Sequence, residues 1–175
     1  IITNTFVLNR LYDETHNGDG SIAEACAKGV ALAKKAVEDC GKEAFVVGDM
    51  TGTGQMLEPY GDYTEEEFIE NFAEQAKALS DAGVDGIIIE TMFDLNEAVC
   101  ALKGVKQVNP DLPVFVSMTY STVANGGRTF MGCSAAQCAE TLAEEGAAAI
   151  GVNCGDLKPE EVAEIIKIYR EVTDL

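Results

Sequence analysis

The sequence has little positive charge: it contains 12 Lys and Arg against 30 Asp and Glu, a formal net charge of -18. A protein that binds nucleic acid needs clustered Lys and Arg to contact the phosphates, so this balance argues against a nucleic-acid partner. No apolar run approaches the roughly 20 residues of a membrane span, and no signal peptide opens the chain. We therefore expect no membrane partner, and we expect the excess acidic residues on an outer layer of helices.

None of the six cysteines belongs to a C-x-x-C pair, and no two of them are adjacent. A disulfide framework is not expected at this length and spacing, which predicts a reducing, cytoplasmic location. We interpret Cys133 as structural and assign no metal role to His16, the only histidine. Four cysteines fall within helical patterns and are interpreted as small core residues: Cys26, Cys40, Cys100 and Cys138.

Short apolar runs alternate with helical patterns about five or six times along the chain. Continuous apolar runs are typical of strands buried on both faces of a parallel sheet. Capping pairs such as Ser21 with Glu24, and Asp94 with Glu97, mark helix starts. Residues 9–20, with a turn over 17–20, and residues 48–54 and 125–128 are predicted as loops. The expected strands are 1–3, 44–47, 84–91, 114–119 and 148–152. The expected helices are 22–40, 64–79, 94–105, 134–142 and a last one that begins near Pro159 and extends through Tyr169.

Two architectures fit this alternation, an open doubly wound sheet and a (β/α)8 barrel. A doubly wound nucleotide-binding sheet would show G-x-G-x-x-G in its first strand–helix turn, and that motif is missing. Polar residues at the carboxyl ends of strands are typical of the mouth of a TIM barrel. Such residues recur at the ends of the expected strands: Asn4, Asp49, Glu90, Thr119, Asn153 and Cys154.

We therefore predict an α/β fold of the (β/α)8 TIM-barrel type, formed by residues 1–175 as one domain. A full barrel needs about 250 residues, so we expect a partial barrel of about six of the eight units, with the first and last units missing. Neither end of the chain resembles a domain boundary, which predicts a fragment of a larger barrel.

The apolar run at 148–152 stops at Asn153, Cys154 and Gly155. As a buried strand, it would place the Cys154 thiol at the strand's carboxyl end, which faces the active site in α/β folds. Gly155 would let the backbone turn there without a steric penalty. The alternative is a buried structural cysteine, because free cysteine is among the most buried residue types.

Five stretches, each weak alone but specific in this order, resemble the homocysteine S-methyltransferase family. The resemblance is strongest to the homocysteine-binding domains of cobalamin-dependent methionine synthases. The stretches are Thr-Asn-Thr-Phe at 3–6, Gly-Asp at 48–49 with Thr-Gly-Gln-Met-Leu-Glu-Pro at 53–59, Gly-Ile-Ile-Ile-Glu-Thr-Met-Phe-Asp at 86–94, Gly-Arg-Thr at 127–129 and Gly-Val-Asn-Cys-Gly at 151–155.

The resemblance implies methyl transfer to the zinc-activated thiol of homocysteine to form methionine, with methylcobalamin as donor. It implies that Cys154 is one of three zinc-bound cysteines and that Glu90 binds the amino group of homocysteine. Asp49 and Asn4 are candidates for lining the substrate pocket, and no residue is assigned as a catalytic acid, base or nucleophile. The expected partners are homocysteine and the cobalamin- and folate-binding domains of the same or a partner chain.

The sequence departs from the family pattern in three places. The other two zinc ligands are adjacent cysteines near the end of the barrel, and no Cys-Cys pair occurs here. The opening strand with its Asp-Gly-Ala-Met-Gly-like stretch is absent, and the loop at 49–54 differs from the usual Gly-Pro-Thr-Gly. One thiolate cannot fill a tetrahedral zinc shell, so we expect this stretch by itself to hold no tight zinc and to have little activity.

Three alternatives stay open at this point. The donor could be S-methylmethionine or betaine, because related enzymes share the barrel. A different (β/α)8 enzyme, such as an aldolase or a phosphate-binding isomerase, would need a Schiff-base Lys at a strand end or a phosphate loop. No Lys of this sequence falls at the end of an expected strand. The third alternative is a non-catalytic segment that assembles with a partner.

Overall fold

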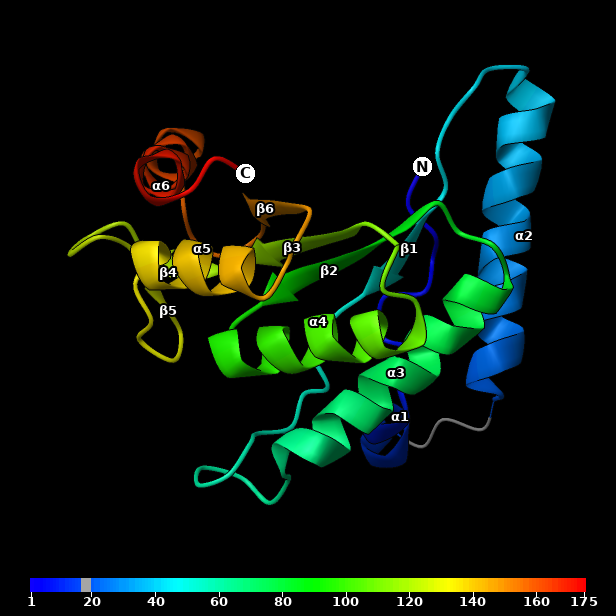
Figure 1. The fold of residues 1–175 in the computed structure, drawn as a ribbon, viewed down its shortest axis with the longest axis horizontal. Helices are drawn as coiled ribbons and strands as arrows, with labels where there is room; N and C mark the ends of the chain where they lie inside the picture. The colour runs from blue at the N-terminus through cyan, green and yellow to red at the C-terminus, as the bar shows by residue number, and fades with distance from the viewer. Residues whose placement is uncertain (17–19) are drawn as a thin grey trace.

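A four-stranded parallel sheet forms the centre of the structure, a computed structural model that describes residues 1–16 and 20–175 (Figure 1). The sheet strands are β1 (Val47–Met50), β2 (Gly86–Met92), β3 (Val114–Met118) and β6 (Ala149–Val152), and the short strands β4 (Tyr120–Thr122) and β5 (Arg128–Thr129) form an antiparallel pair. The helices are α1 (Arg10–His16), α2 (Ile22–Cys40), α3 (Glu65–Asp81), α4 (Leu95–Val108), α5 (Ala135–Glu144) and α6 (Pro159–Val172).

The strands lie in the order β1-β2-β3-β6, which is their order along the chain. The N-terminal segment extends the sheet beyond β1: Ile2 forms a parallel bridge with Val47, and the Thr3 amide donates to the Val47 carbonyl at 2.9 Å. A doubly wound sheet reverses its strand order at a switch point, and no reversal occurs among the strands described. The described part of the chain thus contains five consecutive parallel segments, fewer than the six units predicted.

The helices surround the outer side of this sheet in an arc. Figure 1 shows the arc running from α2 on one flank, through α3, α4 and α5, to α6 on the other. Successive helices pack on one another, α2 on α3, α3 on α4 and α5 on α6. The buried side chains of Ile87 and Ile89 from β2, and of Phe68 and Phe72 from α3, belong to the core that these layers enclose.

The predicted helices are confirmed, and their caps explain where they begin. The Ser21 hydroxyl accepts from the Glu24 amide at the start of α2, and Gly41 ends that helix with a left-handed φ of 65°. Thr64 and Glu67 form a reciprocal capping box at α3. These side chains satisfy amide groups that have no partner within the first helical turn.

Strand β1 differs from its prediction. The strand was expected over residues 44–47 with a loop from residue 48, but β1 begins only at Val47 and runs through Gly48 and Asp49 to Met50. Glycine and aspartate are poor strand formers, so the apolar pattern in the sequence predicted the end of the strand too early. Packing explains the glycine, because a Cβ on Gly48 would lie 2.9 Å from Cδ1 of Leu79 in α3.

Helix α1 and the first residue of strand β5 also lie where loops were predicted. Helix α1 carries one buried side chain, Leu11, and its first turn is capped by Asn9, whose Oδ1 accepts from the Tyr12 amide at 3.0 Å. Strand β4 precedes the predicted loop at 125–128, and β5 begins inside it at Arg128. Residues 17–19 of the predicted turn lie outside the described residues. One apolar side chain gives too little periodicity to predict a helix.

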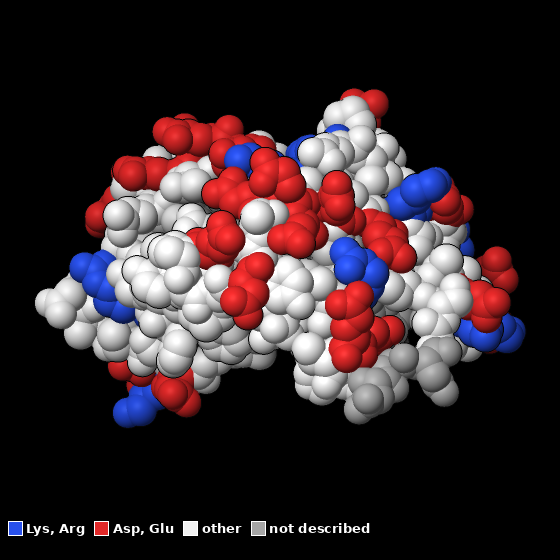
Figure 2. Space-filling view, turned by 90° about the horizontal axis from the view of Figure 1, so that it is seen from below, with Lys and Arg blue, Asp and Glu red and all other residues white. Residues whose placement is uncertain are grey.

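Acidic side chains gather on the surface seen from below in Figure 2, where blue patches are fewer than red ones. The first turn of α3 alone presents Glu65, Glu66 and Glu67. This agrees with the acidic surface expected from the composition. Among the described helices, none has both the length and the apolar character needed to cross a membrane.

We predict that Gly104→Ala destabilises the protein by about 1–3 kcal/mol, the typical cost of overpacking. The new Cβ would lie 2.8 Å from the Ile69 carbonyl oxygen and 3.0 Å from the Ala73 nitrogen, so α3 and α4 would have to separate. The gain of about 1 kcal/mol in helix propensity does not offset this. Urea denaturation measures the change. Gly20→Ala is the control, because nothing lies within 4 Å of its Cβ position. Equal stability of the two variants would contradict the close packing.

Candidate functional site at the carboxyl ends of the strands

The register of the parallel sheet brings polar side chains together on its inner face, opposite the helices. Asp49 pairs with Ile88, and Ser117 pairs with Gly151, so each pair points to the same side. Side chains alternate along a strand, which places residues two positions further along on this face as well. Four polar residues near the carboxyl ends share the face: Asp49, Glu90, Ser117 and Asn153.

The side-chain amide of Asn153 connects these strand ends. Its Oδ1 accepts from the Thr91 amide at 3.0 Å and from the Ser117 hydroxyl at 2.8 Å. Its Nδ2 donates to Oε2 of Glu90 at 3.0 Å and to Oγ1 of Thr91 at 2.8 Å. One side chain after β6 thereby holds groups from β2 and β3.

Cys154 is exposed, so the alternative of a buried structural cysteine is wrong. Its Sγ lies 3.5 Å from Oγ1 of Thr91 and 3.5 Å from Nδ2 of Asn153, the same nitrogen that donates to Glu90. Both Cys154 and Thr91 have positive φ, 53° and 62°, and Gly155 follows with 75°. Positive φ in a β-branched residue such as Thr91 is a genuine outlier, and such backbone strain clusters at functional sites.

Asp49 is almost fully buried, and its Oδ1 has no hydrogen-bond partner among the described residues. Burial raises the pKa of this carboxyl to about 7, with the nearby charge of Glu90 and a hydrogen bond to it adding to the shift. The backbone is held in place from the N-terminal segment, because Thr5 Oγ1 donates to the Asp49 carbonyl at 2.8 Å. Asp49 and Glu90 therefore form a carboxyl pair facing the inner side of the sheet.

Asn4, the fourth predicted site residue, lies in the segment next to β1 and is exposed. Among the described residues, no side-chain hydrogen bond joins it to the group around Asn153, and its role in lining the substrate pocket stays a prediction. Thr119, also predicted at a strand end, donates from Oγ1 to the Asn153 carbonyl at 3.0 Å. It supports the backbone before Cys154.

No group of three or more His, Cys, Asp and Glu that could hold a metal occurs in residues 1–16 and 20–175. Cys154 fits as one ligand, because its thiol is exposed at a strand end. Its two polar contacts, with Oγ1 of Thr91 and Nδ2 of Asn153, are each 3.5 Å long. A tetrahedral zinc site needs three further donors. The described residues therefore do not complete a metal centre.

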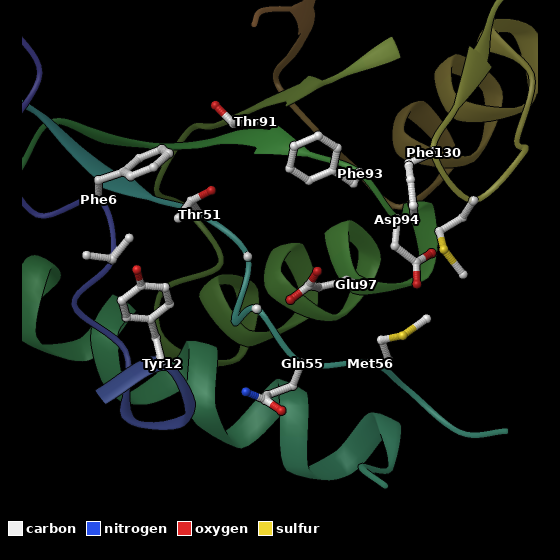
Figure 3. Close-up of a pocket in the computed structure, with 14 residues that line it drawn as sticks. Phe6, Tyr12, Thr51, Gln55, Met56, Thr91, Phe93, Asp94, Glu97 and Phe130 are labelled. Carbon is white, nitrogen blue, oxygen red and sulfur yellow. The ribbon is translucent and has the colours of Figure 1, made fainter. Parts of the chain in front are cut away.

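A cleft of about 460 Å³ opens beside Thr91, between the N-terminal segment, the loop after β1 and the region after β5. Figure 3 shows aromatic and carboxylate side chains around it, among them Phe6, Tyr12 and Phe93. The sequence did not predict these aromatic residues as part of the site. Phe6 lies before α1, Tyr12 lies within α1 and Phe93 lies between β2 and α4, so no single local spacing connects all three.

Glu97 was expected to cap α4, but it turns into this region instead. The α4 cap is made by Asp94, whose Oδ1 accepts from the Asn96 amide at 2.9 Å. Oε1 of Glu97 accepts from the amide and the hydroxyl of Thr53, at 2.7 and 2.8 Å. Burial raises the pKa of Glu97 despite these bonds. Glu97 thereby fixes the glycine-rich loop that forms one wall of the cleft.

The family profile of homocysteine S-methyltransferases matches residues 1–175. The chain belongs to this family. The match confirms the resemblance found in the sequence, and it covers the strand ends that carry Asp49, Glu90 and Cys154.

Two curated relatives are mycobacterial methionine synthases. The protein from Mycobacterium tuberculosis is 28% identical over 173 residues, which cover 94% of this chain and 14% of that protein. The protein from Mycobacterium leprae is 26% identical over 173 residues, with the same coverage of 94% and 14%. The chain thus spans about one seventh of the length of these synthases.

Solved structures of the homocysteine methyltransferase MmuM from Escherichia coli have the same fold. The metallated form superposes with a TM-score of 0.76 at 20% identity and covers 98% of this chain and 62% of that one. The apo form gives 0.74 at 21% identity, covering 98% and 61%. At these identities the likeness shows the fold alone.

We predict that Asp49→Asn flattens the pH dependence of stability. The folded state binds the Asp49 proton more tightly than the unfolded state, because the pKa rises from 3.8 to about 7. This stabilisation is complete below about pH 4 and is lost as the pH rises through about 7. The free energy of unfolding of the variant should therefore fall less than that of the wild type over this range. Urea titrations at several pH values measure it. Asp62→Asn, at an exposed carboxylate, should leave the curve parallel to that of the wild type.

Proposed function

We propose that this chain is part of an enzyme that transfers a methyl group to the thiol of homocysteine and forms methionine. Family membership supports the reaction class. The observation that carries the proposal is the proximity of Glu90 and Cys154, which come from different strands and are connected through Asn153. A carboxylate and a thiol at one strand edge suit a substrate that carries an ammonium at one end and a thiol at the other.

Glu90 binds the amino group of homocysteine in this proposal. A carboxylate forms a strong, charge-assisted hydrogen bond with an ammonium. Asp49 lies beside it, and its buried Oδ1 has no hydrogen-bond partner in the part of the chain that the structure describes, so a cation placed between the two carboxyls would relieve their mutual repulsion. Asn4, from the neighbouring segment, lines the same pocket.

Cys154 is one zinc ligand, with the remaining ligands supplied by residues outside this sequence. When bound, zinc lowers the pKa of a coordinated thiol, so homocysteine becomes a thiolate near neutral pH. The chain's own contribution is to hold the Cys154 thiol exposed at the strand end through the turn at Gly155. We assign no residue of the chain as an acid, base or nucleophile.

Residues 1–175 form one part of a homocysteine-binding (β/α)8 barrel in this proposal. The sequential strand order and the single arc of helices support it. Methylcobalamin, carried by a separate domain that is recharged with folate, is the proposed donor, in view of the methionine synthase relatives. S-methylmethionine or betaine is the alternative donor. Six free cysteines agree with the proposed cytoplasmic location.

We predict that Cys154→Ser abolishes zinc binding by the full-length protein, because the loss of one thiolate leaves a tetrahedral site incomplete. Metal analysis after dialysis measures bound zinc. Cys133→Ser is the control, since Cys133 is bonded through its backbone to Thr129 at β5 and not to the residues that follow β6. Unchanged zinc in the Cys154 variant would remove Cys154 from the metal site.

The methyl donor needs a separate measurement. Single-turnover assays of the full-length protein that supply each methyl donor in turn would identify it.

A further inference from the structure

The orientation of the Asn153 amide is fixed by its partners. The Thr91 backbone N–H can only donate, so the group facing it at 3.0 Å must be the carbonyl Oδ1 of Asn153. The amino group Nδ2 must then face the carboxylate of Glu90, which can accept at 3.0 Å. An aspartate or a rotated amide would place an oxygen against Glu90. The site therefore requires an amide here, in one orientation.

The same amide holds the strained residue between Glu90 and Cys154. Thr91 is bonded to Asn153 twice, through its backbone N–H at 3.0 Å and its Oγ1 at 2.8 Å. Oγ1 of Thr91 also lies 3.5 Å from the Cys154 sulfur. A left-handed conformation at a β-branched residue costs about 1–3 kcal/mol and persists only where its surroundings impose it.

The backbone of Asn153 is held independently of its side chain. The Asn153 amide N–H donates to the Met118 carbonyl at 3.3 Å, and its carbonyl accepts from Thr119 Oγ1 at 3.0 Å. The side-chain bonds are thus not needed to place this segment beside β3. The side-chain bonds of Asn153 instead hold Glu90, Thr91 and Ser117 in position.

We infer that Asn153 is a positioning residue that orients the Glu90 carboxylate for the amino group of homocysteine. This inference rests on the proposed function, because it takes Glu90 as the group that binds the ammonium. Asn153 acts through Glu90 and does not itself contact the substrate. A purely structural cap would satisfy backbone groups, whereas here one of the Nδ2 bonds goes to the carboxylate at the strand end.

The test compares homocysteine with 4-mercaptobutanoate, which has the same thiol, chain and carboxylate but lacks the amino group. Binding of both to the full-length protein is measured by calorimetry for wild type, Asn153→Ala and Glu90→Gln. We expect Asn153→Ala to weaken homocysteine binding about 10-fold, the size typical of a hydrogen bond to a charged group, and to change 4-mercaptobutanoate binding less than about 2-fold. The double variant should bind homocysteine no more weakly than Glu90→Gln alone, because coupled residues are not additive.

Ser117→Ala is the matched control, because it removes one bond to the same amide but leaves the Nδ2 bond to Glu90 in place. It should keep homocysteine affinity within about 3-fold of the wild type. Equal losses for both ligands in Asn153→Ala would overturn the inference and make the residue a general structural one. A loss in Glu90→Gln without one in Asn153→Ala would overturn the inference alone. Unchanged affinity in Glu90→Gln would overturn the proposed function itself.

Discussion

Parallel pairing of strands in chain order is the constraint on which the whole site depends. Because β1, β2, β3 and β6 run in one direction, their carboxyl ends meet at one edge. Groups more than 60 residues apart, such as Glu90 and Asn153, thereby come within hydrogen-bond distance. Each connection returns through a helix on the outer side, which leaves the inner side free for polar side chains. The order and direction of the strands therefore bring the site residues together, and the individual side chains then set the contacts between them.

The side chain of Asn153 fixes the positions of the polar groups along this shared edge. Side chains at the ends of strands have few packing neighbours, so hydrogen bonds must fix their rotamers. The oxygen of the Asn153 amide accepts two hydrogen bonds, one from β2 and one from β3. Its nitrogen donates two, both to residues of β2. Two non-glycine residues with positive φ, Thr91 and Cys154, lie on either side of it. Their strain can persist because this network is connected, and a partly satisfied network would be costly.

Much of this could be predicted from the sequence, because helix caps, apolar runs and residues after strand ends are local signals. The capping of α3 by Thr64 and the exposed thiol at Cys154 depend on a few neighbouring residues. Other features could not be predicted. Asp49 lies inside a strand because Gly48 lets Leu79 pack closely, a contact between distant residues. Glu97 fits a helix cap by its spacing, yet a loop 44 residues away binds it instead.

Placing the carboxyl groups of Asp49 and Glu90 side by side is energetically unfavourable unless a ligand binds between them. Burial disfavours the charged form of Asp49, whose Oδ1 has no partner among residues 1–16 and 20–175, and Glu90 adds repulsion. A fold selected for stability alone would replace one of the two by an amide, since a neutral partner removes the repulsion and keeps the hydrogen bond. The pair becomes favourable when a cation lies between the two groups. The raised pKa of Asp49, the bond from Asn153 to Glu90 and the exposed Cys154 thiol therefore lie together at one strand edge, as the proposed binding of an ammonium there requires.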